Sequence, residues 1–153
     1  MANTYTQLNV HAVFSVKGRG NFLSSSVRSE LYPYISGILK DSGNYPLAIN
    51  GYKDHVHVFF EINPANSVSD VLKEIKSNSS RWINDRRFMP GKFNWQTGFG
   101  AFSYSRSQRN NVIQYIVNQE QHHHVTTFRE EYLKLLEKFE IDYNLHYTFE
   151  FYD

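Results

Sequence analysis

The stretch Asp54-His55-Val56-His57-Val58-Phe59-Phe60 decides the fold, because its alternation and its β-branched and aromatic residues predict a β-strand. Residues two apart on a strand point to the same face, so His55 and His57 should stand side by side. The valines, Phe60 and Ile62 would then face a core. Two imidazoles on a rigid element can bind a metal ion. The alternative is an exposed strand face that carries two histidines by chance.

Length and composition predict one packed domain over residues 1–153, with 41% hydrophobic residues and no cysteine for disulfides or thiolate metal sites. Residues 1–7 have neither the basic nor the apolar region of a secretory signal, and no apolar run is long enough to span a membrane. We therefore expect a cytoplasmic protein without a membrane partner; the DNA-associated, prokaryotic part of this expectation comes from the family resemblance described below.

The net charge of +1 gives no global indication of a nucleic-acid partner, but basic residues are concentrated between residues 73 and 109. That segment could follow a phosphate backbone, and the alternative is an ordinary solvated basic face. A basic turn after the first predicted strand adds two more cations. The candidate DNA-binding residues are Lys17, Arg19, Lys73, Lys76, Arg81, Arg86 and Arg87.

The order of the predicted elements indicates an α+β, ferredoxin-like fold over a core of about residues 5–105. In this split β-α-β arrangement an antiparallel sheet carries helices on one face. His11, on the first strand, falls on the same side as the histidine pair. The predicted elements are a strand over 8–16, a helix over 24–39, a strand over 45–52, the histidine strand, a helix over 67–83 and a strand over 101–104.

The final third of the chain is predicted to be helical. A helix over about 107–122 lies within a tyrosine-bearing segment of about 106–123, and a second amphipathic helix covers 126–139. Residues 142–153 alternate and are aromatic, which predicts an extended arm packed on the domain or on a partner subunit.

Tyr115 lies off the apolar side of its predicted helix. The apolar stripe is formed by Val112, Ile113, Ile116 and Val117. Tyr115 falls roughly 120° from the centre of that stripe, with Gln119 and His122 following it one turn apart. The alternative is an exposed tyrosine with two polar neighbours.

The chemistry of a phenol connects this helix to the histidine strand. A tyrosine hydroxyl is a weak nucleophile at neutral pH, so its attack on a phosphodiester needs a polarised phosphate. A divalent cation supplies that polarisation. His55 and His57 could hold the cation, and Gln119 could add an oxygen ligand. This donor set suits Mg²⁺ or Mn²⁺ better than a closed structural zinc site.

The two motifs together resemble the single-tyrosine HUH transposases of the smallest bacterial insertion sequences. The resemblance rests on Asp54-His55-Val56-His57 and on Tyr115-Ile116-Val117-Asn118-Gln119 followed by histidines, and it covers nearly the whole chain. It implies an enzyme that cleaves and rejoins single-stranded DNA at hairpin-marked ends through a 5′-phosphotyrosine.

By the same resemblance, Tyr115 is the nucleophile, and His55, His57 and Gln119 bind the divalent metal. His11 and His122 are candidates to support these ligands, and the run His122-His123-His124 leaves open which histidine approaches the metal. Members of this family look like obligate homodimers, in which the tyrosine helix of one subunit can complete the site of the other.

Two other functions remain open. One is a zinc hydrolase that uses His55, His57 and one histidine of 122–124, with Tyr115 as an orienting hydroxyl. The other is a catalytically silent or domesticated protein that binds DNA hairpins.

Overall fold

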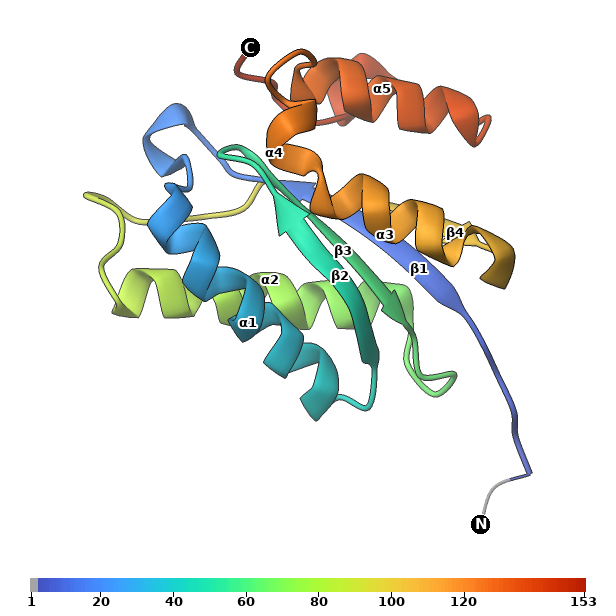
Figure 1. Cartoon of the computed structure of the whole chain (residues 1–153). Helices are drawn as coiled ribbons and strands as arrows, with labels where there is room; N and C mark the ends of the chain where they lie inside the picture. Colours follow the sequence, from blue (N-terminus) through green and yellow to red (C-terminus); the bar gives the residue numbers. More distant parts are fainter. Residues whose placement is uncertain (1–2) are drawn as a thin grey trace.

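A four-stranded antiparallel sheet is the centre of the computed structural model, which describes residues 3–153; the first two residues of the expected 1–153 domain lie outside this range (Figure 1). The strand order is β2-β3-β1-β4, so the histidine strand is central. The bounds are β1 Asn9–Ser15, β2 Tyr45–Gly51, β3 His55–Glu61 and β4 Gly100–Tyr104. In the register of β1 and β3, Val13 lies opposite His57. The predicted α+β, ferredoxin-like class is confirmed.

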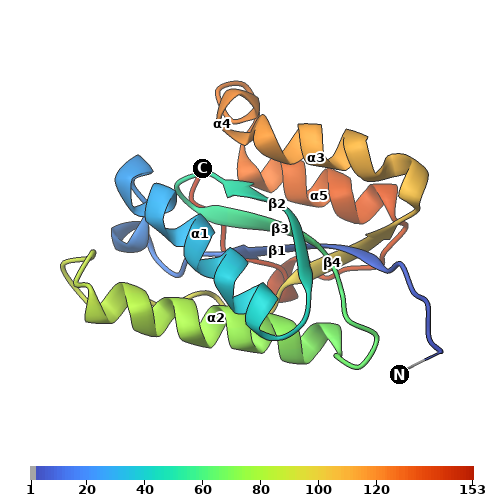
Figure 2. The ribbon, with the colours of Figure 1, turned by 60° about the horizontal axis from the view of Figure 1, so that its bottom comes forward.

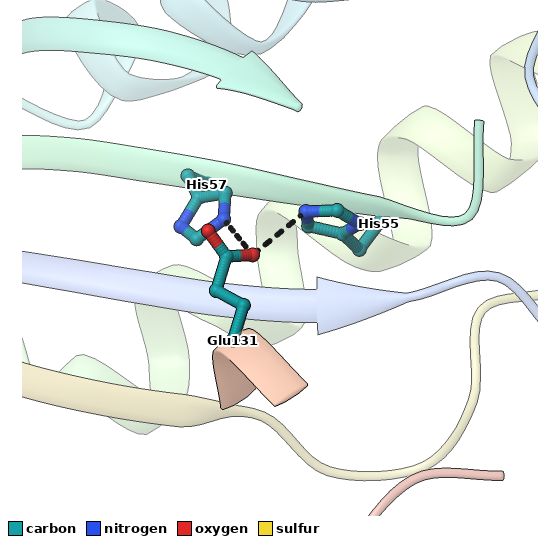
Figure 3. Close-up of side chains that lie close together, drawn as sticks. All are labelled: His55, His57 and Glu131. Atoms are coloured by element: carbon teal, nitrogen blue, oxygen red, sulfur yellow. Dashed lines mark hydrogen bonds and ion pairs between the residues drawn. The ribbon is translucent and has the colours of Figure 1, made fainter. Parts of the chain in front are cut away.

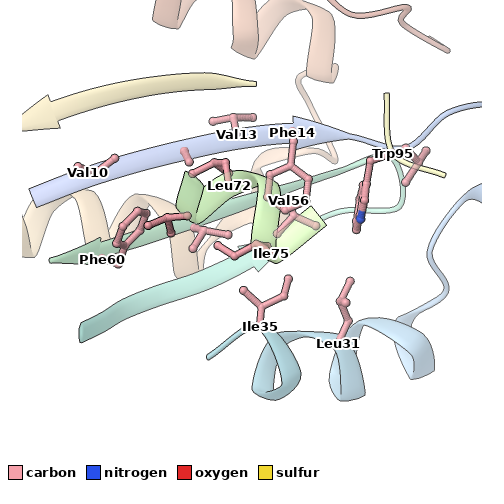
Figure 4. Close-up of a cluster of buried hydrophobic side chains, with 14 of the residues drawn as sticks. Val10, Val13, Phe14, Leu31, Ile35, Val56, Phe60, Leu72, Ile75 and Trp95 are labelled. Atoms are coloured by element: carbon pink, nitrogen blue, oxygen red, sulfur yellow. The ribbon is translucent and has the colours of Figure 1, made fainter. Parts of the chain in front are cut away.

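Two long helices, α1 (Ser25–Asp41) and α2 (Val68–Asp85), cover one face of the sheet (Figure 2). Each begins at a serine whose hydroxyl accepts a backbone N–H of the first turn: Ser24 from Val27 and Ser67 from Asp70. Beneath the helices lies the main core, in which alternate strand residues pack against helix residues (Figure 4). Its members include Phe14, Val56, Phe60, Leu31, Ile35, Leu72, Ile75 and Trp95.

Three further helices cover the opposite face: α3 (Arg109–Val117), α4 (Gln119–His122) and α5 (Phe128–Lys138) (Figure 2). The histidine side of β3 is therefore not solvent-exposed. His11, His55 and His57 each have 0% of their surface accessible. The alternative of a decorated, exposed strand face is wrong, because a second layer of helices buries these histidines.

The single helix predicted over 107–122 is wrong in detail, because it is divided at Asn118. Residues 106–108 form a short 3-10 turn, α3 follows, and Asn118 leaves the helical conformation with φ −93° and ψ 15°. The side-chain amide of Asn50, on β2, donates hydrogen bonds to the carbonyl oxygens of Ile116 (3.0 Å) and Val117 (3.1 Å). Carbonyls at the end of a helix lack intrahelical partners, and here a neighbouring strand supplies one.

The division of the helix changes which residues face the sheet. Val112 and Ile116 are buried against Phe59, whereas Val117 is 50% exposed and does not belong to the buried stripe. After the turn, the buried position is occupied by Gln119, with 0% accessibility. Val112 and Ile116 of the predicted apolar stripe thus face the sheet, but Val117 does not. The side-chain amide of Gln119 completes the sheet-facing side.

The last residues pack on their own domain. Helix α5 begins with a capping box between Thr127 and Glu130. Phe149 and Phe151 lie against Phe128 and Tyr132 of the same chain, with a 3-10 turn, η3, at Leu145–Tyr147. Within residues 3–153, none of the helices combines the length and apolar character that crossing a membrane requires.

Candidate active site

Each histidine of β3 contacts a neighbouring side chain through its Nδ1 atom, which leaves its Nε2 atom to face the site. His55 Nδ1 lies 2.7 Å from Asp54 Oδ1, and His57 Nδ1 lies 2.7 Å from His11 Nε2. Partners of this kind fix the orientation and tautomer of a metal-binding imidazole. Both Nε2 atoms consequently point away from the strand toward α5 (Figure 3). The structure thus places His11 behind His57, where it supports the ring.

A carboxylate that the sequence interpretation missed lies at the centre of the site. Glu131 projects from α5 toward the strand and is 3% exposed (Figure 3). Its Oε1 lies 3.2 Å from His55 Nε2, 3.0 Å from His57 Nε2 and 3.1 Å from His123 Nε2. Its Oε2 accepts hydrogen bonds from the Tyr115 hydroxyl and from Gln119 Nε2, the latter at 2.7 Å. One oxygen faces the histidines and the other faces the tyrosine.

Gln119 turns its amide oxygen toward the histidines. Oε1 lies 3.0 Å from His55 Nε2, a residue 64 positions away in the chain, and 3.0 Å from His123 Nε2. The Tyr115 ring meets the His57 ring edge-on, with centroids 5.9 Å apart. The structure therefore brings Tyr115, Gln119, His55 and His57 together within a single chain.

The charges of this cluster are strongly coupled. Burial would raise the pKa of the Glu131 carboxyl, but the adjacent His57, His123 and His55 hold it well below its usual range. Burial and the charge of Glu131 raise the pKa of Tyr115, so its phenol is protonated and donates to the carboxylate. Burial lowers the pKa of His57, which favours a neutral imidazole. At His55 the bonds to Asp54 and Glu131 outweigh burial and raise the pKa to about 9.

The arrangement of donor atoms fits a divalent cation. His55, His57 and Glu131 are all buried, and one ligand atom of each lies within 4.8 Å of the others. Two ligands at right angles around an ion about 2.1 Å from each are about 3 Å apart. The distances from His55 Nε2 to Gln119 Oε1 (3.0 Å) and from His57 Nε2 to Glu131 Oε1 (3.0 Å) match that separation. Imidazole nitrogens suit transition metals, and carboxylate and amide oxygens suit Mg²⁺ or Mn²⁺, so this mixed set of donors can hold a divalent cation.

The three consecutive histidines lie in different surroundings. His123 faces the ligand cluster, and its Nδ1 lies 2.7 Å from the Thr126 carbonyl oxygen. His122 lies on the other side of Tyr115, with ring centroids 5.5 Å apart, and its Nε2 is 3.4 Å from Glu131 Oε2. His124 is exposed. Of the three, His123 therefore approaches the two histidines of β3 most directly.

The candidate DNA-binding cations lie away from this cluster. Lys73, Lys76 and Arg81 belong to α2, and Arg86 and Arg87 follow it, on the opposite face of the sheet (Figure 2). Lys76 donates hydrogen bonds to the carbonyl oxygens of Gln96 and Gly98, both at 2.7 Å, and Arg86 pairs with Glu30 at 2.9 Å.

The turn with Lys17 and Arg19 lies against the C-terminal segment. The Gly18 N–H donates to the Tyr152 hydroxyl (2.6 Å), and the Arg19 guanidinium lies 5.9 Å from the centre of that ring. The structure does not bring these two cations into the tyrosine and histidine cluster.

A signal for Glu131 was present in the sequence. On α5, Glu131 shares the buried side with Phe128, Tyr132 and Leu135, at the i, i+3, i+4, i+7 spacing of an amphipathic helix. An acid inside such a stripe needs a buried partner. Asp54 and His123 were visible within their motifs, but their roles depend on the tertiary contacts.

Comparison with known proteins agrees with this geometry. A family model described as "Transposase IS200 like" matches residues 4–119. The ISDra2 transposase TnpA of Deinococcus radiodurans is 24% identical over 118 residues, which cover 74% of this chain and 84% of that protein.

Two solved structures share the fold. A proposed transposase from Deinococcus radiodurans has a TM-score of 0.62 at 24% identity, covering 78% of this chain and 95% of that one. A REP-associated tyrosine transposase bound to a REP hairpin has a TM-score of 0.59 at 15% identity, covering 100% and 93%.

Proposed function

The chain belongs to the IS200-like family of transposases, and from this membership we propose that it cleaves and rejoins single-stranded DNA at hairpin-marked element ends, with Tyr115 as nucleophile. One observation carries the proposal. The hydroxyl of Tyr115, the Nε2 atoms of His55 and His57 and the amide of Gln119 all converge on the two oxygens of a single buried carboxylate, Glu131. A hairpin substrate is supported by the REP hairpin bound to a protein of the same fold.

In the proposed reaction the phenolic oxygen of Tyr115 forms a bond to the scissile phosphorus. The bond from phosphorus to the 3′ oxygen breaks, leaving a 5′-phosphotyrosine and a 3′-hydroxyl. Glu131 Oε2 accepts the phenolic hydrogen bond and so holds the tyrosine oxygen in position. Over the whole step Tyr115 loses one proton and the departing 3′ oxygen gains one, so the protons balance. The reverse step returns the proton to Tyr115 and rejoins the strands without a nucleotide cofactor.

His55, His57, Gln119 and Glu131 are the residues that would hold the divalent cation, Mg²⁺ or Mn²⁺. When bound, such an ion polarises a phosphate oxygen and stabilises developing negative charge. Asp54 and His11 orient the two imidazoles from behind, and the cluster of His55, His57, Gln119 and Glu131 is buried under α5. A positioned set of buried donors is what a phosphoryl transfer requires, because most of its catalysis is positioning and charge stabilisation.

The same contacts bear on how the site is assembled. Tyr115 reaches the histidines of its own chain, so we propose that the site is completed in cis. The homodimer expected from the resemblance stays a prediction, and in this proposal it would serve DNA binding rather than supply the nucleophile.

The experiment that tests the function is incubation with single-stranded hairpin DNA and Mn²⁺, followed by denaturing electrophoresis for a covalent protein–DNA adduct. The wild type should form the adduct. Tyr115→Phe should abolish it while leaving hairpin binding intact, and Tyr147→Phe, at a hydroxyl-bearing residue that is 88% exposed, is the matched control. Adduct formation by Tyr115→Phe at the wild-type rate would contradict the nucleophile assignment. Hairpin binding without any adduct would favour the alternative of a catalytically silent DNA-binding protein. Tightly bound zinc without DNA cleavage would favour the zinc hydrolase.

A further inference from the structure

A groove of about 280 Å³ lies between α3 and α5, directly beside the catalytic cluster. Tyr115 and Glu131 form part of its wall, and the apolar side chains of Val112 and Leu135 form another part. Its volume is near the lower end of the range for ligand pockets, which leaves room for one ring system rather than for a duplex. Any group that occupies it would lie in contact with the nucleophile.

The polar groups of the groove are suited to an anionic, ring-bearing occupant. Lys134 and Lys138 are exposed cations along the α5 side, and Glu131, the one carboxylate among the lining residues, is buried and engaged by histidines. His122 also lines the groove beside Tyr115, and its Nε2 lies 3.4 Å from Glu131 Oε2.

The α3 side of the groove offers groups that recognise a base. Gln108 and Asn111 are exposed and present both amide donors and acceptors, and their mutual contact is long, at 3.4 Å. Side-chain amides of this kind hydrogen-bond base edges. Tyr104 adds a second aromatic ring to the wall, with the Lys138 ammonium 5.5 Å from the centre of that ring.

We propose that this groove holds the nucleotide adjoining the phosphate attacked by Tyr115, with its base between α3 and α5 and its phosphate facing Lys134 and Lys138. The inference rests on the proposed function, because it takes Tyr115 as the nucleophile. It adds a source of sequence selectivity at the cleavage site. Asn111 and Gln108 select the base, and the two lysines hold the strand in register with the tyrosine.

The first test measures binding alone, so it does not depend on cleavage. Fluorescence anisotropy of a labelled short oligothymidylate is followed with metal-free protein in a chelator. The Lys134→Ala, Lys138→Ala double variant should bind roughly fivefold more weakly than the wild type, with a reduced salt dependence. The control is Lys40→Ala, an exposed lysine on α1, on the other face of the sheet. Equal affinity of the double variant and the control would overturn the proposal.

The second test measures base selectivity. Protein and Mn²⁺ are incubated with a randomised single-stranded oligonucleotide pool, the covalent adducts are isolated, and the base beside the linked phosphate is sequenced. Asn111→Ala should weaken the wild-type base preference at that position, whereas Asn110→Ala, an exposed neighbour outside the groove, should keep it. An unchanged preference in Asn111→Ala overturns base selection by the groove. If the wild type forms no adduct, the proposed function fails, and the binding test alone then decides the groove.

Discussion

Glu131 places a negatively charged carboxylate in the buried interior of the protein, where charge is unfavourable. A buried ion costs several kcal/mol unless nearby groups compensate it. Within the described residues, its ion-pair partners are His55, His57, His122 and His123 rather than a lysine or arginine. Histidines compensate a carboxylate fully only when they are protonated, whereas a divalent cation bound between them compensates it at any pH where they are neutral.

This charge balance leads to a prediction for Glu131→Gln. The substitution keeps the shape of the side chain and removes the charge, so the affinity for Mn²⁺, measured by titration calorimetry, should fall by roughly tenfold to a hundredfold. Adduct formation should fall with it. Glu130→Gln, at the exposed neighbouring residue of the capping box, is the matched control. Unchanged Mn²⁺ affinity in Glu131→Gln would show that the carboxylate is not a ligand.

At the residue scale, the site residues that lie in local sequence motifs were predicted. Glu131, which reaches the site only through tertiary packing, was missed. The pairing of His55 with His57 follows from the two-residue period of a strand. Tyr115 and Gln119 follow from helical spacing. Glu131 meets them only because α5 folds back over α3 and the sheet, a contact that no local pattern encodes.

The β2–β3 hairpin fixes the histidine strand through a glycine. A Cβ added at Gly51 would lie 2.2 Å from the carbonyl oxygen of His55, and the Tyr52 N–H donates to that same oxygen at 3.0 Å. The chain therefore passes too close to itself at this point for any side chain. His55, the first residue of β3, supplies the carbonyl oxygen at this close approach.

Gly51→Ala should accordingly lower the free energy of unfolding by roughly 1–3 kcal/mol, measured by urea denaturation. Gly37, inside α1 with no atom within 4 Å of an added Cβ, gives the opposite expectation. Gly37→Ala should raise the free energy of unfolding by about 0.5–1 kcal/mol, because alanine loses less backbone entropy in a helix. A Gly51→Ala variant as stable as the wild type would refute the steric argument.

At the scale of elements, each predicted strand and each long helix was found, but the tyrosine helix was predicted as continuous. The residues around Asn118 have no proline or glycine to end a helix. The division depends on Asn50, whose amide satisfies carbonyls of α3 from a strand far away in sequence. Such a tertiary contact overrides local helical spacing, so sequence periodicity alone could not place it.

In the whole molecule, the sheet separates two layers with different roles. The layer of α1 and α2 carries most of the predicted DNA-binding cations, while the layer of α3, α4 and α5 carries Tyr115, the proposed nucleophile, and Glu131 (Figure 2). A DNA molecule that touches both must pass around an edge of the sheet. We therefore expect cations on α2 to affect the affinity for a hairpin and those beside Tyr115 to affect cleavage.

If the site is assembled within one chain, as proposed, a mixture of two inactive variants should stay inactive. His57→Ala and Tyr115→Phe should each be inactive, and mixing them should not restore adduct formation, because neither chain contains a complete site. The mixture is incubated with hairpin DNA and Mn²⁺ after a cycle of subunit exchange, beside each variant alone. Recovery of a substantial share of wild-type adduct would instead demonstrate a site shared between subunits.

The position of Glu131 along the chain has a consequence for the timing of synthesis. His55, His57 and Tyr115 all precede α5 in the chain, so the ribosome produces them before Glu131. Domains fold as they emerge from the ribosome. Until α5 docks, a nascent chain has Tyr115, the proposed nucleophile, without the carboxylate that accepts its hydrogen bond. The proposed active site is therefore completed only late in synthesis, after the sheet and the tyrosine helix have been made.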